Sequence, residues 1–154
     1  MPIRARLLLC VLIGCVAGNA ALAQGWRIHE GVEASVRNRA GNSSLLIQCI
    51  QDGRIFMRVQ FHTYTNIWMN EKAVVRIGTK SFPVEIGIGN DFMYLSNAPE
   101  SAISTELIDA LKGGGMLVLE GPAVGRLSEA QRSFPLDGGG KLIEEVQKDC
   151  GRRQ

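Results

Sequence analysis

Among the side chains that most often act as bases, nucleophiles or metal ligands, the chain has two histidines, His29 and His62, and four cysteines. A Ser-His-Asp hydrolase needs its histidine within hydrogen-bond reach of an activated hydroxyl, and neither histidine lies in a motif of that kind. No Gly-x-Ser-x-Gly sequence occurs, and His29-Glu30 lacks the second histidine, four residues on, of a zinc-binding helix. The sequence therefore predicts no catalytic residues, no metal site and no cofactor. One enzymatic hypothesis stays open, a hydrolase that uses His62.

The start of the chain has the pattern of an export signal. Arg4 and Arg6 precede an apolar run from Leu7 to Ala17, and Ala21-Leu22-Ala23 follows it. A basic start, a short apolar stretch and an Ala-x-Ala site are the parts of a secretory signal peptide. The run is shorter than the roughly 18 to 20 residues of a spanning helix. We expect a signal peptide at residues 1–23 and a mature chain at 24–154, periplasmic or secreted.

A second cleavage site lies within the same segment. Leu12-Ile13-Gly14-Cys15 resembles a bacterial lipobox, in which the cysteine is lipidated and becomes the first residue. Cleavage there would leave a lipoprotein anchored through Cys15. Only for that product do we expect attachment to a membrane.

The charge balance argues against one class of partner. The chain has 17 basic and 15 acidic residues, and removal of Arg4 and Arg6 with the signal leaves the remainder formally neutral. Nucleic-acid binding relies on clustered positive charge that displaces counterions from phosphates, and the spacing of Lys and Arg provides no such cluster. We expect a protein partner in the bacterial envelope and no nucleic acid.

Cys49 and Cys150 are the cysteines that remain after export. An isolated pair in an oxidising compartment typically forms a disulfide, and neither cysteine lies in a Cys-x-x-Cys motif. Closing a loop of about 100 residues would stabilise the fold by up to roughly 4 to 5 kcal/mol. We expect a structural Cys49–Cys150 disulfide.

Short segments between Val32 and Leu95 alternate apolar and polar residues, which is typical of antiparallel strands. Asp52-Gly53 predicts a type I′ turn between two of them. A second hairpin should turn at Gly78-Thr79, and Pro83 predicts that its second strand lies at an edge or turns its proline side to solvent. The first hairpin should place on one face Leu45, Ile47, Cys49, Ile55, Met57, Val59 and Phe61, and on the other Arg58, Gln60, His62 and Tyr64.

The second half of the chain predicts two helices. Ser104 can cap the first, which should end at Gly113, and the last should run from about Gly140 to Cys150. We expect a strand at 116–119 between them and a further strand within 125–134. The whole pattern predicts one α+β domain, an antiparallel β-sheet or sandwich with two helices, the C-terminal one stapled by the disulfide.

Aromatic and soft side chains gather after the first hairpin. Tyrosine and tryptophan often anchor protein partners, so this cluster is a candidate partner-binding surface, and an exposed sheet face is another. The alternative is that Ile67 and Trp68 fold back over the core. The candidate partner-binding residues are His62, Tyr64, Trp68 and Met69.

Several short motifs recur in one family of exported proteins. They are Trp26 near the mature start, Leu-x-x-x-Cys ending at Cys49, Leu-x-x-x-Leu ending at Leu111, and Phe134-x-Leu136-x-Gly138 before a helix that closes on Cys150. With them the chain resembles the VasI or TagO family of type VI secretion accessory proteins, and it is less similar to the invasion-associated locus B family. The resemblance implies a non-enzymatic periplasmic accessory factor and transfers no catalytic residues.

Together these patterns predict a non-enzymatic interaction protein of the bacterial envelope, with a link to secretion implied by the resemblance. The alternative is a periplasmic inhibitor or binder of an exported enzyme or of cell-wall fragments.

Overall fold

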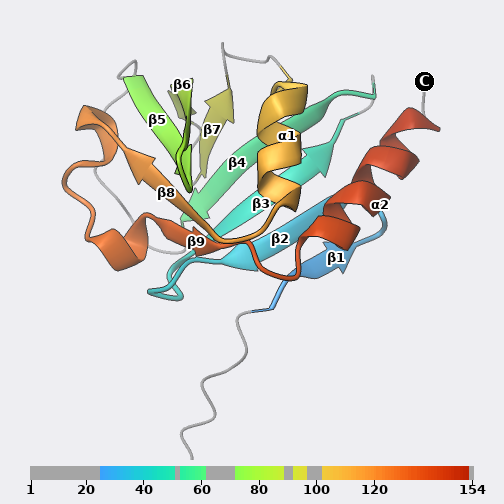
Figure 1. Cartoon of the computed structure of the whole chain (residues 1–154), viewed down its shortest axis with the longest axis horizontal. Coiled ribbons are helices and arrows are strands. Elements are labelled where there is room, and N and C mark those ends of the chain that lie inside the picture. Colours follow the sequence, from blue (N-terminus) through green and yellow to red (C-terminus); the bar gives the residue numbers. More distant parts are fainter. Residues whose placement is uncertain (1–24, 51–52, 62–71, 89–91, 97–101, 153–154) are drawn as a thin grey trace, which may run out of the picture.

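The computed structural model describes residues 25–50, 53–61, 72–88, 92–96 and 102–152 (Figure 1). The predicted signal peptide and Cys15 lie outside these ranges. The elements, in chain order, are strands β1 (Arg27–His29), β2 (Glu33–Arg37), β3 (Ser43–Cys49), β4 (Ile55–Phe61), β5 (Lys72–Ile77), β6 (Lys80–Ile88) and β7 (Phe92–Ser96), helix α1 (Thr105–Lys112), strand β8 (Met116–Glu120), short 3-10 helices η1 (Pro122–Val124) and η2 (Glu129–Gln131), strand β9 (Ser133–Pro135) and helix α2 (Gly140–Gly151).

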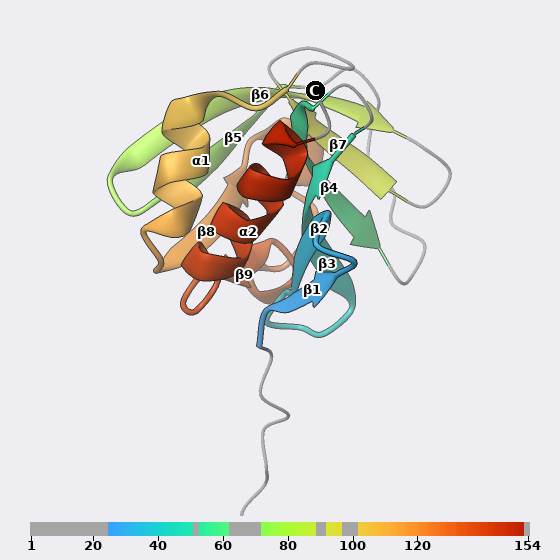
Figure 2. The ribbon, with the colours of Figure 1, turned by 90° about the vertical axis from the view of Figure 1, so that its right-hand side faces the viewer.

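The described strands form one continuous antiparallel sheet in the order β1-β2-β3-β4-β7-β6-β5-β8-β9. The sheet curves so far that β9 meets the chain just after β2 (Figure 1). There the Arg39 amide donates to the Ser133 carbonyl (3.0 Å) and the Ala40 amide to the Ala130 carbonyl (3.1 Å). Figure 2 shows α1 and α2 on the inner side of this curve. The predicted α+β class, an antiparallel sheet with two helices, is confirmed.

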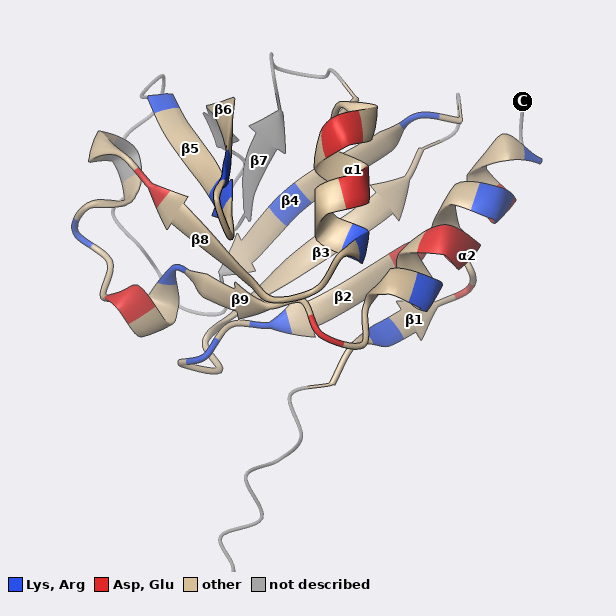
Figure 3. Cartoon of the chain, viewed as in Figure 1, with Lys and Arg blue, Asp and Glu red and all other residues tan. Residues whose placement is uncertain are grey.

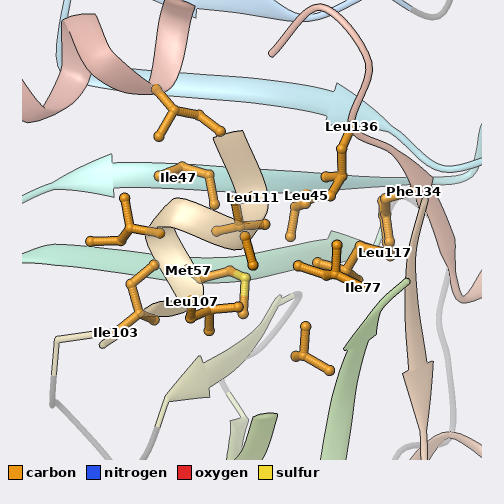
Figure 4. Close-up of a cluster of buried hydrophobic side chains, with 14 of the residues drawn as sticks. Leu45, Ile47, Met57, Ile77, Ile103, Leu107, Leu111, Leu117, Phe134 and Leu136 are labelled. Atoms are coloured by element: carbon orange, nitrogen blue, oxygen red, sulfur yellow. The ribbon is translucent and has the colours of Figure 1, made fainter. Parts of the chain in front are cut away.

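The core fills the inner side of the sheet. Successive strand residues point to opposite faces. The predicted inner residues of β3 and β4 between Leu45 and Val59 are buried, and the side chain of Phe61 lies outside the described part. Leu107 and Leu111 of α1 lie among the strand side chains in Figure 4, and Ile143 and Val146 of α2 are fully buried. Each such side chain contributes about 1.5 to 3 kcal/mol through burial.

Both predicted hairpins are present. In the second, Ile77 pairs with Lys80 around Gly78, whose φ is 58°. In the first, the Ile50 amide donates to the Arg54 carbonyl and Gly53 has φ 76°. Ile50 and Arg54 therefore pair with three residues between them, and Gly53 is the last of the three, so the predicted two-residue turn at Asp52-Gly53 is wrong.

The sequence allowed two placements of Pro83, in an edge strand or with its proline side turned to solvent. Its strand β6 lies between β5 and β7, so the prediction of an edge strand is wrong. Pairing with β7 runs from Glu85 to Ile88, however, and among the described residues the exposed Pro83 pairs only with Val74 of β5. The missing N–H therefore interrupts no pairing with β7.

The helices begin and end close to the predicted residues. The Ser104 side chain accepts a hydrogen bond from the Leu107 amide (3.2 Å), which satisfies one of the free donors at the start of α1. Gly113 caps its end. The strand expected within 125–134 is β9, which begins at Ser133.

The predicted disulfide is confirmed. Cys49 at the end of β3 is bonded to Cys150 in the last turn of α2, with their Cα atoms 5.4 Å apart. Both cysteines are buried, at 8% and 1% exposure. The bond therefore fixes the last helix to a central strand of the sheet.

A buried asparagine organises the turn between β2 and β3. Asn38 is 0% exposed. Its Oδ1 accepts from the amides of Asn42 (3.0 Å) and Ser43 (3.2 Å), while its Nδ2 donates to Asn42 Oδ1 and to the Gln131 carbonyl (both 2.8 Å). One side chain thus joins this turn to η2, 93 residues away along the chain.

Candidate functional site

The face of the sheet that turns away from the helices carries a pocket of about 500 Å³ over β1 to β4. Small-molecule and peptide-end sites typically have volumes of this order. The pocket is built from alternate residues of neighbouring strands, whose side chains point away from the core. Its central members are Arg27, His29, Ser35, Arg37, Ser44 and Leu46.

Strand register sets the middle of the pocket. Arg27 of β1 lies opposite Ser35 of β2, and Ser35 lies opposite Leu46 of β3. Directly opposed side chains in an antiparallel pair have Cβ atoms about 4.5 to 5.5 Å apart. A cation, a hydroxyl and an apolar side chain therefore follow one another across three strands.

The two ends of the pocket differ in charge. At one end Arg37 lies opposite Ser44, which in turn lies opposite Gln60 of β4. At the other end His29 lies opposite Glu33. The pocket therefore runs from a basic end to an end that carries a carboxylate.

Two of the pocket's cations have no acidic partner in the part of the chain that the structure describes. These are Arg27 and Arg37, both exposed. Arg58, by contrast, pairs with Glu33 through Nη2 and Oε2 at 3.4 Å, and because Glu33 is on β2 and Arg58 on β4 this pair spans β3. Figure 3 shows the basic positions on β1, β2 and β4. The guanidinium groups of Arg27 and Arg37 give the pocket an excess of positive charge.

The floor of the pocket is apolar. Leu46 points to the outer face but is only 4% exposed. On the same face Phe56 is 8% exposed, and the Arg54 guanidinium carbon lies 5.6 Å from the centre of its ring. A ligand that reaches Leu46 would bury little further apolar surface of the protein there. The polar groups of the ligand would therefore have to supply specificity.

His29 and Ser35 form the contact in this pocket that most resembles catalytic machinery. Ser35 Oγ lies 3.3 Å from His29 Nε2, and the contact is exposed. A serine hydrolase also needs a third group that orients the histidine. Among the described residues, none forms a hydrogen bond with His29 Nδ1. The pair meets one requirement of nucleophilic catalysis and lacks another.

The structure describes two of the six residues that were proposed from the sequence. Cys49 and Cys150 form the disulfide. The stretch 62–71, which lies outside the described residues, contains His62, Tyr64, Trp68 and Met69. The hypothesis of a hydrolase that uses His62 therefore concerns a residue outside the described part. The structure adds a site on an exposed sheet face.

Sequence reasoning missed this pocket, although part of its signal was present. Glu33, Ser35 and Arg37 alternate with the buried Ala34 and Val36, which predicts a polar outer face for this strand. Nothing local showed that residues 27–29 form β1 and bring Arg27 and His29 beside this strand. That arrangement depends on pairing between strands.

The described residues contain no group of three or more His, Cys, Asp or Glu side chains arranged to hold a metal ion. Neither helix of the described part has the length and apolar character needed to cross a membrane. A disulfide is typical of proteins outside the cytoplasm. The chain matches no protein-family model, no curated protein and no solved structure.

Proposed function

We propose that this chain is a non-enzymatic interaction protein of the bacterial envelope, exported to the periplasm, which binds a protein partner through the pocket on the outer face of β1 to β4. The observation that carries the proposal is the pair of exposed guanidinium groups, Arg27 and Arg37, beside a pocket of about 500 Å³. Exposed cations without acidic partners add little to stability. They can, however, form charge-assisted hydrogen bonds with a ligand.

The disulfide and the export signal support the location. The Cys49–Cys150 bond is of a kind that persists in an oxidising compartment, and residues 1–23 have the pattern of a secretory signal. Binding is favoured over catalysis because His29 and Ser35 lack an orienting partner among the described residues. A rigid sheet also holds the pocket in place, which lowers the entropic cost of binding.

Site-specific photocrosslinking in living cells tests the proposal. Benzoyl-phenylalanine replaces Gln60 at the basic end of the pocket in one strain and the exposed Glu144 of α2 in another. We expect a discrete adduct with one envelope protein from position 60, identified by mass spectrometry and reproduced with the two purified proteins. The same adduct from position 144, or none from position 60, would contradict the proposal.

A further inference from the structure

The pocket's charges define the kind of group that it binds. We infer that it recognises a short acidic peptide segment of the partner, in an extended conformation, with a carboxylate held between Arg27 and Arg37. This inference rests on the proposed function and adds the ligand class. Guanidinium groups bind carboxylates through charge-assisted, often bidentate hydrogen bonds.

The length of the pocket fits a peptide better than a simple anion. Glu33, Ser35 and Arg37 are alternate residues of one strand, so the distance from the acidic end to the basic end is about 13 Å. An extended peptide of about four residues covers the same distance. A phosphate ion would occupy only a small part of a volume of about 500 Å³.

The remaining groups of the pocket suit the other parts of a peptide. Ser35 and Ser44 carry hydroxyls that can donate or accept, and Gln60 carries an amide that can do both. Leu46 offers an apolar floor between them. A peptide backbone presents N–H and C=O groups in alternation, and this mixture of donors and acceptors can satisfy both.

Charge also gives the bound peptide a direction. Glu33 stands four residues from Arg37 on β2, at the end of the pocket next to His29. Arg58 already pairs with Glu33, so a second carboxylate at that end would find no free cation there, whereas one beside Arg27 and Arg37 would be attracted. The acidic side chains of the peptide should therefore gather at one end of the pocket, and neutral residues should occupy the other.

Fluorescence anisotropy with the purified, oxidised chain tests this inference. The probe is a fluorescein-labelled hexapeptide, Ser-Gly-Asp-Glu-Asp-Ala, and its matched control has Asn and Gln in place of Asp and Glu. We expect saturable binding of the acidic probe and at least tenfold weaker binding of the neutral one. Equal binding of the two would overturn the inference.

Matched variants of the protein locate the binding. Arg27→Gln with Arg37→Gln should weaken binding of the acidic probe at least tenfold. Lys80→Gln with Lys141→Gln removes the same two charges at exposed positions that do not line the pocket, and should change affinity less than twofold. Similar losses in both double variants would overturn the inference. Arg37→Glu alone, at an exposed position, should abolish binding and serves if the first double variant fails to fold.

Two competitors separate this ligand class from others. Inorganic phosphate at a hundredfold excess should displace little of the probe, and full displacement would mean a simple anion site. A disaccharide-tetrapeptide from the cell wall that binds more tightly than the probe would likewise overturn the inference.

If position 60 crosslinks to a partner but the acidic probe does not bind, the ligand class is wrong and the proposed function stands. If the probe binds but no partner is crosslinked, the proposed function is wrong and the ligand class stands.

Discussion

The indole ring of Trp26 lies directly against the backbone of Gly139, the residue that precedes α2. A Cβ atom added at Gly139 would stand 2.6 Å from Trp26 Nε1. The residue just before β1 and the start of the last helix therefore pack through a glycine that leaves room for an aromatic ring.

Gly139→Ala should destabilise the protein. Gly139 has φ −79° and could hold an alanine without backbone strain, so the cost comes from displacing the half-buried Trp26. Overpacking of this kind costs about 1 to 3 kcal/mol. Urea unfolding measures it. Gly151→Ala is the control, because open space surrounds Gly151 in the last turn of α2, and it should be neutral or slightly stabilising.

Cys49→Ala with Cys150→Ala should lower the free energy of unfolding by roughly 4 to 5 kcal/mol, because the disulfide closes a loop with a sequence separation of 101. Urea unfolding with and without reductant gives the value. Reductant should destabilise the parent protein and leave the double variant unchanged. Intact mass provides an independent check, since alkylation without reductant should modify neither cysteine. A parent protein equally stable in both conditions would show that the bond contributes nothing.

Asn38→Ala should destabilise the protein by about 2 to 4 kcal/mol. The substitution removes four hydrogen bonds at a site with 0% exposure and leaves buried backbone groups without partners. Thermal or urea unfolding measures the change. Arg39→Ala alters the next, exposed side chain, whose backbone amide alone contacts Ser133, and should stay within about 0.5 kcal/mol of the parent. Equal effects of the two substitutions would contradict this role for Asn38.

Glu33→Gln should strengthen binding of the acidic hexapeptide about fivefold. The change removes one negative charge from the pocket and releases Arg58 from its ion pair, so a bound carboxylate should gain roughly 1 kcal/mol. Anisotropy titration at low salt measures the gain, which should shrink in 0.5 M NaCl. Glu144→Gln removes the same charge from the exposed face of α2 and should leave the affinity unchanged. A gain in both variants would point to net charge alone.

Local periodicity was enough to predict most individual elements. Leu45, Ile47 and Cys49 alternate along β3, and Ile143, Val146 and Cys150 lie on one side of α2, so the sequence predicted both buried faces and the bond between them. The signal for each buried face lies within one element, whereas the bond was predicted from the two cysteines that remain after export. The signal for the cap at Ser104 also lies within one element.

Long-range pairing could not be predicted in the same way. The contact of β4 with β7 and that of β5 with β8 join strands separated along the chain. The pocket shares this origin, since Ser35 acquires Arg27 and Leu46 as neighbours only through pairing on both sides of β2. The burial of Leu46 on the outer face follows from the same arrangement.

The return of β9 to the chain after β2 has a consequence for self-association. An unpaired strand edge is a template on which a second molecule can add its own strand, and such additions lead to aggregation. In the described part of the chain, the Arg39 amide already occupies the Ser133 carbonyl on the outer side of β9. The opposite edge is β1, only three residues long and carrying Arg27. The curvature that encloses the core therefore also protects the sheet from growing into fibrils.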